Sequence, residues 1–376
     1  MKTGIAERIR SIRGVIATEY LKRHSDPWIV AYSGGKDSTL LLQLVWEMLA
    51  ELPPEKRRRV VYVVANDTLV ESPMVIDHLR KSIAVIRETA KSAWLPIETH
   101  ITKPAVDQTF WVNVIGRGYM PPTRNFRWCT DRMKILPTKR LIGRLLARHK
   151  RAILLVGTRK SESISRRRRM DGRGVKADTM NPHSRIEGCR MFAPLADLED
   201  NDVWTVLIQS KPPWGGTHRD LITLYRNAGG GECPLVLTKA DAPSCGTTSP
   251  RFGCWTCTVV QKDRSMRGTI DSGHMESDKL ELLSDFREEL MALREDDGNR
   301  MTVRRDGHSK SRADGSRVYG PFTMEMRRHI LARLHELEAQ IGEGLISDGE
   351  IEAIEDVWWR DETREEGRLA LLERIA

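Results

Sequence analysis

Short apolar runs and longer stretches with helical spacing alternate along the first 160 residues of the chain. The runs at 28–32 and 60–65 consist mostly of apolar, β-branched or aromatic residues, which is typical of strands buried on both faces. The longer stretches repeat apolar positions every three or four residues, as Ile5, Ile9 and Ile12 do, and this spacing indicates helices. Strands are predicted at 28–32, 60–65, 97–102 and 152–156, and helices at 5–24, 40–52, 73–94, 105–115 and 132–149.

This alternation predicts an α/β fold built on a doubly wound parallel sheet. Ligands of such sheets bind beyond the carboxyl ends of the strands. Three charged residues stand shortly after predicted strands, namely Asp37, Asp67 and Arg159. We therefore expect a site at this edge of the sheet, with these residues among its candidates.

The pattern changes beyond about residue 210. A Pro- and Gly-containing stretch at 211–216 is typical of a loop or linker, and four cysteines follow it. The polar, Arg- and Lys-rich stretch at 297–320 is expected to be an exposed loop, and helices are predicted on either side of it. The predicted organisation is an α/β domain at 1–210, a cysteine-rich segment at 211–267 and a helical region at 268–376.

The sharpest local feature is a seven-residue loop between the first strand and the helix after it. It consists of Ser33, Gly34, Gly35, Lys36, Asp37, Ser38 and Thr39. Adjacent glycines let backbone N–H groups approach an anion, the helix N-terminus adds partial positive charge, and the hydroxyls add donors. The loop therefore predicts a phosphate cradle, with an ordinary Gly-rich turn as the alternative. Asp37 is expected to hold Mg²⁺ or to organise the loop, and Lys36 to contact phosphate.

The chain is basic, with 61 Lys and Arg against 52 Asp and Glu, a net charge of +9. This balance suits a polyanion such as nucleic acid, although a solvated basic surface explains it equally well. Arg159 at a strand end is a candidate for planar recognition of phosphate oxygens. The arginine run 166–169 that follows can track a nucleic-acid backbone or form a solvated loop.

Four of the six cysteines lie between 233 and 257, and the last two form a CxxC pair. Four thiolates can hold zinc or an iron–sulfur cluster, and the single CxxC favours a [4Fe–4S] cluster. The predicted ligands are Cys233, Cys245, Cys254 and Cys257. Cys129 stands among cationic residues that would depress its pKa, so it is a candidate sulfur carrier, a further ligand or a buried thiol. Cys189 has no partner spacing and is expected to be structural, within a loop.

No signal-peptide pattern and no run of 18 apolar residues occur in the sequence, so we expect a cytoplasmic protein without a membrane span. Six cysteines in 376 residues are too few for a disulfide scaffold. The expected cytoplasmic location and the low number of cysteines both favour a metal-binding role for the cysteine group.

The loop resembles the SGGxDS loop of the PP-loop ATP pyrophosphatases. The chain as a whole resembles their phosphoadenosine phosphosulfate (PAPS) reductase-like branch, and within it the DndC/SspD-type DNA phosphorothioation sulfurtransferases. The similarity spans roughly residues 25–267. The segments that carry it are Tyr32–Thr39, Asn66–Pro73, Arg127–Lys134, Gly157–Ser163, Asp202–Trp204, Gly231–Leu235, Ser244–Gly246 and Arg251–Val260.

The resemblance implies ATP-dependent insertion of sulfur into DNA. ATP would adenylate a backbone phosphate and release pyrophosphate, and sulfur from a cysteine desulfurase would then displace AMP. It also implies an iron–sulfur cluster and further components of the phosphorothioation system as partners. The residues expected to bind ATP are Ser33 to Thr39, Asp67 and Arg159, and those expected to act in catalysis are Lys36, Asp37, Ser38, Arg159 and Cys129.

Two departures from the reductases bear on this interpretation. No cysteine follows Cys257, so a C-terminal redox thiol is missing, and Cys129 stands alone where related reductases carry a cysteine pair. The cluster would then use three cysteines with an open iron, or Cys233 as the fourth ligand, which we favour. Reduction of an activated sulfate nucleotide, tRNA thiolation and a non-catalytic, cluster-bearing scaffold stay open as alternatives.

Overall fold

The structure is a computed structural model that describes residues 4–184, 186–227, 253–271, 273 and 276–375. The chain forms two compact units, each assembled from three segments. Unit 1 comprises Met1–Asp67, Ser72–Thr102 and Thr138–Phe252, and unit 2 comprises Thr68–Glu71, Lys103–Pro137 and Gly253–Ala376. The division into 1–210, 211–267 and 268–376 stays a prediction, and the contacts group the chain differently because they join segments that are distant in sequence.

A six-stranded sheet with the order β3-β2-β1-β4-β6-β5 forms the centre of unit 1. Trp28 in β1 lies opposite Val61 in β2 and Ile153 in β4, and these pairs are parallel, as is β6 with β4. Only β5 in this sheet runs antiparallel, against β6. The predicted α/β fold with a mostly parallel, doubly wound sheet is confirmed. The strands are β1 (Trp28–Ala31), β2 (Val61–Asn66), β3 (Ile97–Thr102), β4 (Ala152–Leu155), β5 (Met180–Pro182) and β6 (Cys189–Phe192).

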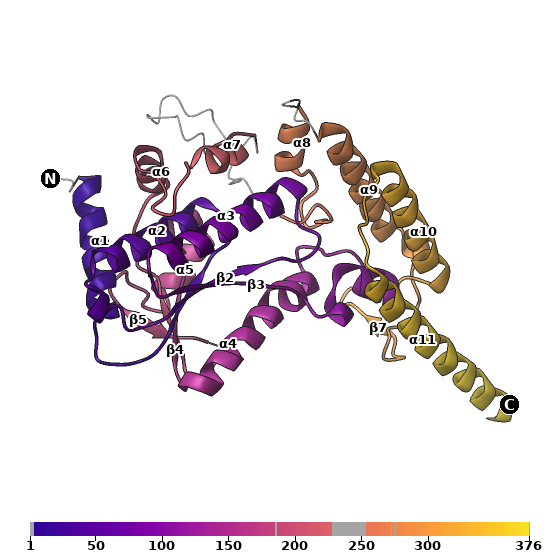
Figure 1. Ribbon diagram of the computed structural model, residues 1–376. Helices are drawn as coiled ribbons and strands as arrows, with labels where there is room; N and C mark the ends of the chain where they lie inside the picture. The colour runs from indigo at the N-terminus through magenta and orange to yellow at the C-terminus, as the bar shows by residue number, and fades with distance from the viewer. Residues whose placement is uncertain (1–3, 185, 228–252, 272, 274–275, 376) are drawn as a thin grey trace. The chain divides into compact units, whose positions relative to one another are not determined.

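Helices cover both faces of this sheet, because successive side chains of a strand point to opposite faces. Trp28 and Val30 pack with α1, α2, α3, α6 and α7 in one apolar core, whereas Ile29 packs with α4 in another. Figure 1 shows α3 and α4 on opposite sides of β2 and β3. The helices of unit 1 are α1 (Ile5–Tyr20), α2 (Lys36–Glu51), α3 (Pro73–Ser92), α4 (Leu136–His149), α5 (Ile164–Asp171), α6 (Asp200–Gln209) and α7 (Arg219–Asn227).

The described part of unit 2 is mainly helical, and none of its helices or those of unit 1 is long and apolar enough to cross a membrane. Trp111, Trp255 and Phe286 pack together in its interior. The stretch 297–320, expected to be a loop, contains a short antiparallel hairpin. The elements are α8 (Arg264–Asp271), α9 (Ser277–Glu295), α10 (Met324–Ile341) and α11 (Asp348–Ile375), with β7 (Lys310–Ser311) and β8 (Arg317–Val318).

Two helices predicted near residues 105–115 and 132–149 differ from the structure at their starts. The first is a 3-10 turn at Val106–Gln108 followed by a π-helix at Val112–Gly116. A second π-helix, Thr130–Ile135, precedes α4. Pro137 has no N–H to donate to the carbonyl four residues earlier, and a wider turn before it accommodates that loss. Local spacing alone did not distinguish these geometries.

Candidate functional site

The seven-residue loop lies in unit 1, between the end of β1 and the start of α2. Gly34 has φ of +73°, a conformation that favours glycine. Gly35 precedes the first residue of α2 and has no side chain of its own that could cap the helix. The backbone N–H of Lys36 donates to the Tyr225 hydroxyl at 3.4 Å. The N-terminus of a helix after a glycine loop is a common anion-binding geometry, as the sequence predicts.

Ser38 holds the loop in shape from the inside. Its hydroxyl donates to the Gly35 carbonyl at 2.9 Å and accepts from the Ser33 N–H at 3.2 Å. The Ser33 and Ser38 hydroxyl oxygens lie 3.2 Å apart, and Thr39 is buried. Ser38 is therefore engaged with the loop backbone, and its expected contact with phosphate stays a prediction.

A network of charges centred on Arg159 contacts the loop through Asp37. The guanidinium is fully buried and donates from Nε to Asp37 Oδ1 at 2.6 Å and from Nη2 to Asp200. Its Nη1 donates to Ser161 Oγ at 2.6 Å and to the Leu198 carbonyl at 3.3 Å. Burial acts to lower the pKa of Arg159, but the two carboxylates raise it above the ordinary value, so the side chain is cationic.

This geometry corrects the role expected for Arg159. The sequence suggested direct recognition of phosphate, whereas the structure places the guanidinium out of solvent and against protein carboxylates. The guanidinium of Arg159 thus fixes the position of the Asp37 carboxylate, and the two roles expected for Asp37 stay predictions. Glu162 accepts from the backbone N–H of Arg159 at 2.8 Å and from Arg166 Nη1 at 3.1 Å.

Lys36 lies within the same network. It is buried, and its Nζ lies 3.8 Å from Asp200 Oδ1, 4.0 Å from Asp37 Oδ2 and 5.1 Å from the centre of the Tyr225 ring. Its contact with phosphate stays a prediction. Sequence reasoning missed Asp200 and Tyr225. The acidic start of α6 was a signal for Asp200, but nothing local marks Tyr225.

Asp67 stands at the carboxyl end of the sheet, as predicted, directly after β2. It is buried and accepts from Arg80 Nη2 at 2.9 Å. Asn66, just before it, accepts from the Thr138 hydroxyl at 2.8 Å. These contacts join the end of β2 to α3 and α4, and a role for Asp67 in binding ATP stays a prediction.

Gly157 allows the strand end after β4 to approach the loop. A Cβ atom there would lie 2.8 Å from the Asp37 carbonyl oxygen and 3.1 Å from the Ser38 nitrogen. Both neighbours are backbone atoms at the start of α2, which cannot move aside as a flexible side chain can. Only glycine fits, so the close approach of β4 to the phosphate loop depends on this residue.

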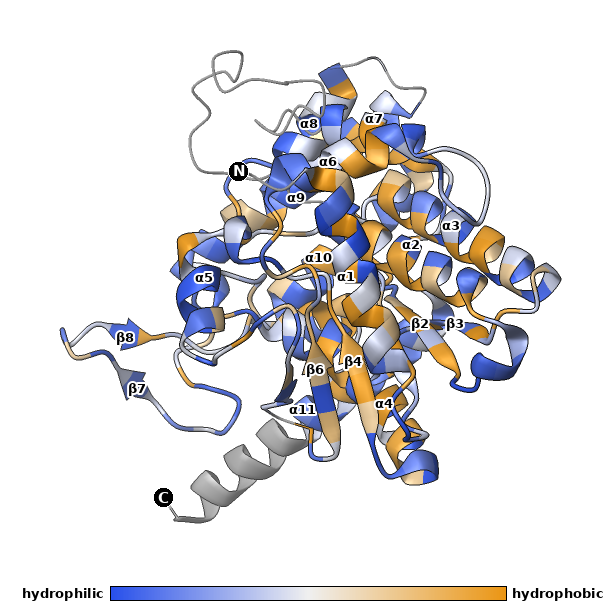
Figure 2. Ribbon diagram, turned by 90° about the vertical axis from the view of Figure 1, so that its left-hand side faces the viewer, coloured by the Kyte–Doolittle hydropathy of each residue, from blue (hydrophilic) through white to orange (hydrophobic). Residues whose placement is uncertain are grey.

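A second basic feature of unit 1 lies next to this network in the sequence. A cavity of about 490 Å³ is lined by Thr158, the residue before Arg159, and by Arg166, Arg169 and Arg173. The two arginines of α5 that line it are three residues apart and share one face of the helix. Figure 2 shows that α5 is strongly hydrophilic. This arrangement makes a basic pocket at the end of β4.

The CxxC pair lies in unit 2 and is held by several contacts. Cys254 Sγ lies 3.3 Å from Thr68 Oγ1, and the Trp255 N–H donates to the Val70 carbonyl at 3.0 Å. The buried Arg287 donates to the Cys257 carbonyl at 2.7 Å. The pair is therefore fixed between residues 68–71 and α9.

Cys129 lies in the same unit, directly before the second π-helix. Burial raises its pKa, and the neighbouring Cys257 adds to this effect, while Lys134 opposes it. The expected depression of its pKa by cations is wrong, because loss of hydration outweighs the nearby charge. Burial likewise raises the pKa of Cys254, on which Glu71, Lys134 and Cys257 also act. Cys257 thus acts electrostatically on both Cys129 and Cys254.

The described residues supply only part of the predicted cluster ligands. Cys233 and Cys245 lie outside them, and no group of three or more His, Cys, Asp or Glu arranged for a metal occurs in the part of the chain that the structure describes. Cys254 and Cys257 fit as two thiolate ligands of a four-cysteine set. Cys189 is buried in β6, not in a loop, and burial raises its pKa to about 11.

We expect Cys254→Ser to lose bound iron when the protein is purified without oxygen, because serine is a poor ligand for a soft metal centre. Cys189→Ser is the matched control, since Cys189 lies in the core of unit 1. The cluster content of both variants is measured as iron and acid-labile sulfide per chain, together with the visible absorbance. Equal iron in Cys254→Ser and the unsubstituted protein would contradict the ligand assignment, and one zinc per chain would contradict the cluster.

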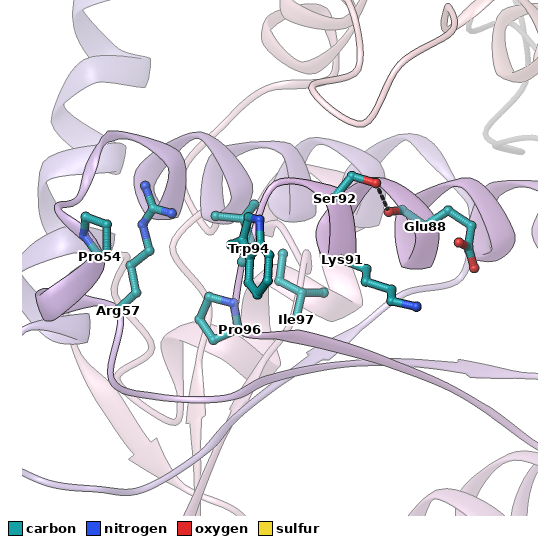
Figure 3. A pocket seen from close by; sticks show the side chains of 9 residues that line it. Pro54, Arg57, Glu88, Lys91, Ser92, Trp94, Pro96 and Ile97 are labelled. Carbon is teal, nitrogen blue, oxygen red and sulfur yellow. Dashed lines mark hydrogen bonds between the residues drawn. The ribbon is translucent and has the colours of Figure 1, made fainter.

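A further cavity, of about 720 Å³, lies beside the start of β3, at the amino ends of the parallel strands. Figure 3 shows Trp94, Arg57 and Pro96 around it. Trp94 is 89% exposed. The parallel strands direct their carboxyl ends away from this cavity, so it is separate from the phosphate loop.

Comparison with known proteins gives the family of this fold and loop. Residues 27–260 match the phosphoadenosine phosphosulfate reductase domain, and no curated protein matches the chain. A PAPS reductase from Candida auris is 15% identical, with 55% of this chain and 84% of that chain covered and a TM-score of 0.34. The U34-tRNA thiolase NcsA from Methanococcus maripaludis, solved with its [4Fe–4S] cluster, is 14% identical, with coverage of 77% and 80% and a TM-score of 0.36.

The ammonia-dependent NAD synthetase from Campylobacter jejuni is 12% identical, with 78% of this chain and 97% of that chain covered and a TM-score of 0.36. The domain match covers more than half of the chain and includes the loop, the charge network and the CxxC pair. The parallel sheet, the glycine loop before α2 and this match agree. The chain belongs to the phosphoadenosine phosphosulfate reductase domain family.

Proposed function

We propose that this protein is an ATP-dependent sulfurtransferase that replaces a non-bridging oxygen of a DNA backbone phosphate with sulfur. The observation that carries the proposal is in unit 1, where the Arg159 network beneath the loop adjoins the pocket lined by Thr158 and three arginines. A phosphate cradle with a second basic pocket at the same strand end suits the joining of ATP to another phosphate group.

In the first step, an oxygen of the DNA phosphate attacks the α-phosphorus of ATP, and pyrophosphate leaves. The first turn of α2 would hold the ATP phosphates, and Lys36 would offset their charge. Arg159 and Asp200 keep Asp37 in place. The Asp37 side chain is 23% exposed, so its carboxylate can contribute an oxygen to the Mg²⁺ that accompanies ATP.

In the second step, sulfur at the oxidation level of sulfide attacks the adenylated phosphate and AMP leaves. A cysteine desulfurase would supply the sulfur as a persulfide, which a thiol reductant reduces by two electrons to sulfide. The thiols of unit 2 are the candidates for handling this sulfur. Cys254, Cys257, Cys233 and Cys245 would hold a [4Fe–4S] cluster, and with all four bound no iron is open to sulfide, so Cys129 is the candidate thiol for carrying the sulfur. Other phosphorothioation components are the expected partners.

The test is formation of phosphorothioate on DNA by the purified protein with ATP, Mg²⁺, cysteine, a desulfurase and dithiothreitol as the reductant. Mass spectrometry of the nuclease-digested DNA measures the product. We expect Arg169→Ala/Arg173→Ala to raise the KM for DNA about tenfold, because it removes two phosphate contacts. Arg167→Ala/Arg168→Ala is the matched control, since these exposed neighbours are not among the residues that line the pocket.

Equal KM values for the two double variants would contradict the acceptor pocket. Sulfur incorporated into tRNA but not DNA would replace the proposed substrate, and sulfite formed from PAPS with thioredoxin would assign a reductase.

A further inference from the structure

The hairpin of unit 2 forms a basic pocket that the proposed chemistry does not use. The cavity, of about 610 Å³, is lined by residues of the hairpin and of the loop before the second π-helix. Five of its lining side chains are basic and one is acidic. The charged lining residues are Arg300, Arg304, Arg305, Lys310, Arg312 and Asp306.

Two of these arginines build the wall of the pocket. Arg305 makes a two-pronged ion pair with Asp361, at 2.7 and 2.9 Å. Arg300 donates to the Tyr319 carbonyl at 2.7 Å and to the Gly320 carbonyl at 2.9 Å. Because these contacts engage both guanidinium groups, they fix the shape of the pocket.

The other cations are directed to solvent. Arg304, Lys310 and Arg312 are exposed. Arg304 pairs with the exposed Asp306 at 3.5 Å, and Arg312 donates to the Ser316 hydroxyl at 3.0 Å. Such exposed pairs are weak and exchange readily for a phosphate. Lys310 and Arg312 lie on or beside β7, which can be followed in Figure 2.

Aromatic side chains complete the lining. Tyr119, Phe126 and Tyr319 line the pocket, and the rings of Tyr119 and Phe126 are 6.3 Å apart. Phe126 is 44% exposed, although burial of an aromatic ring is strongly favourable. Cations combined with exposed aromatic rings are the feature with which proteins bind single strands, because bases stack on the rings and phosphates contact the cations.

We infer that this pocket binds single-stranded DNA. A base can enter among Tyr119, Phe126 and Tyr319 only when it is unstacked, and the bases of a duplex are not. The choice of DNA over RNA rests on the proposed function, whereas binding of a single strand rests on the pocket alone. The pocket would hold part of the acceptor strand.

The test is fluorescence anisotropy of a labelled dT12 oligonucleotide with the full-length protein, without ATP or sulfur donor, at several salt concentrations. We expect Lys310→Ala/Arg312→Ala to weaken binding at least tenfold. Each phosphate contact adds about 0.7 to the slope of log K against log salt for single strands, so the slope should fall by about 1.4. The control Lys262→Ala/Arg267→Ala removes the same charge from exposed positions of unit 2. It should change the dT12 affinity and the salt slope by less than Lys310→Ala/Arg312→Ala does.

Phe126→Leu separates stacking from charge. We expect about tenfold weaker dT12 binding with an unchanged salt slope, because the ring is lost and the cations stay. Equal dT12 affinity and equal salt slope in the two double variants would overturn the inference. Tighter binding of duplex DNA or of rU12 than of dT12 would also overturn it, as would a Lys310→Ala/Arg312→Ala variant that loses only ATP binding. A further outcome is that the pocket variants bind dT12 more weakly while the unsubstituted protein forms no phosphorothioate. That result would support the assignment of the pocket and refute the proposed function.

Discussion

Arg159→Met is expected to lower the rate of pyrophosphate release from ATP at least 100-fold and the free energy of unfolding by about 3 kcal/mol. The variant keeps an unbranched, flexible side chain but removes the charge that Asp37 and Asp200 share. Removal of one partner of a buried ion pair typically costs about 3 kcal/mol or more. Asp37 would also lose its fixed position, and misplacement of about 1 Å can cost about 100-fold in rate.

Two further variants identify the cause of that loss. In Arg159→Met/Asp200→Asn the destabilisation should be smaller than the sum of the single effects by about 1 kcal/mol, because the second change removes the unpaired carboxylate. Arg360→Met is the matched control in an exposed pair, Arg360 with Asp356, and should change stability by less than about 1 kcal/mol. Urea unfolding and a pyrophosphate assay measure these effects. Arg159→Met with normal pyrophosphate release would refute the positioning role.

Gly157→Ala is expected to reduce pyrophosphate release by about 100-fold as well, through a different route. The added methyl would lie 2.8 Å from the Asp37 carbonyl oxygen, so the start of α2 must shift away from β4. Overpacking against backbone typically costs about 1–3 kcal/mol, and the shift moves the loop that we propose holds ATP. The KM for ATP and the rate should therefore both worsen.

Gly143→Ala is the matched control for this substitution. Gly143 lies within α4, and a Cβ there meets no atom within 4 Å. Alanine is favoured over glycine inside a helix by about 0.5–1 kcal/mol, so this variant should be slightly more stable and fully active. If Gly157→Ala behaves like Gly143→Ala, the close approach of β4 to the loop has no functional consequence.

The position of the loop between β1 and α2 was predictable because its signal is local. Two adjacent glycines after a buried strand and before an apolar helix indicate an anion site without knowledge of any distant residue. The role of Arg159 was not predictable in the same way, since its partners Asp37 and Asp200 are 122 and 41 positions away. A strand-end arginine therefore suggested a phosphate contact, and only the fold revealed the two carboxylates.

Cys129 illustrates the same difference for a pKa. The sequence places cationic residues around it, which suggested a depressed pKa. The pKa of a thiol also depends on its hydration, and burial of Cys129 raises it more than Lys134 lowers it. Burial depends on packing by the whole of unit 2, so no local pattern reports it.

The sequence by itself determined the alternation of strands and helices, the parallel sheet and the place of the phosphate loop. These depend on hydrophobic periodicity and on glycine, which act over a few residues. The tertiary structure decided which charges neutralise one another, which thiols are buried, and which basic residues join Tyr119, Phe126 and Tyr319 in one pocket. Burial and electrostatic contact depend on distance in space, and the fold brings together residues that the sequence separates by more than a hundred positions.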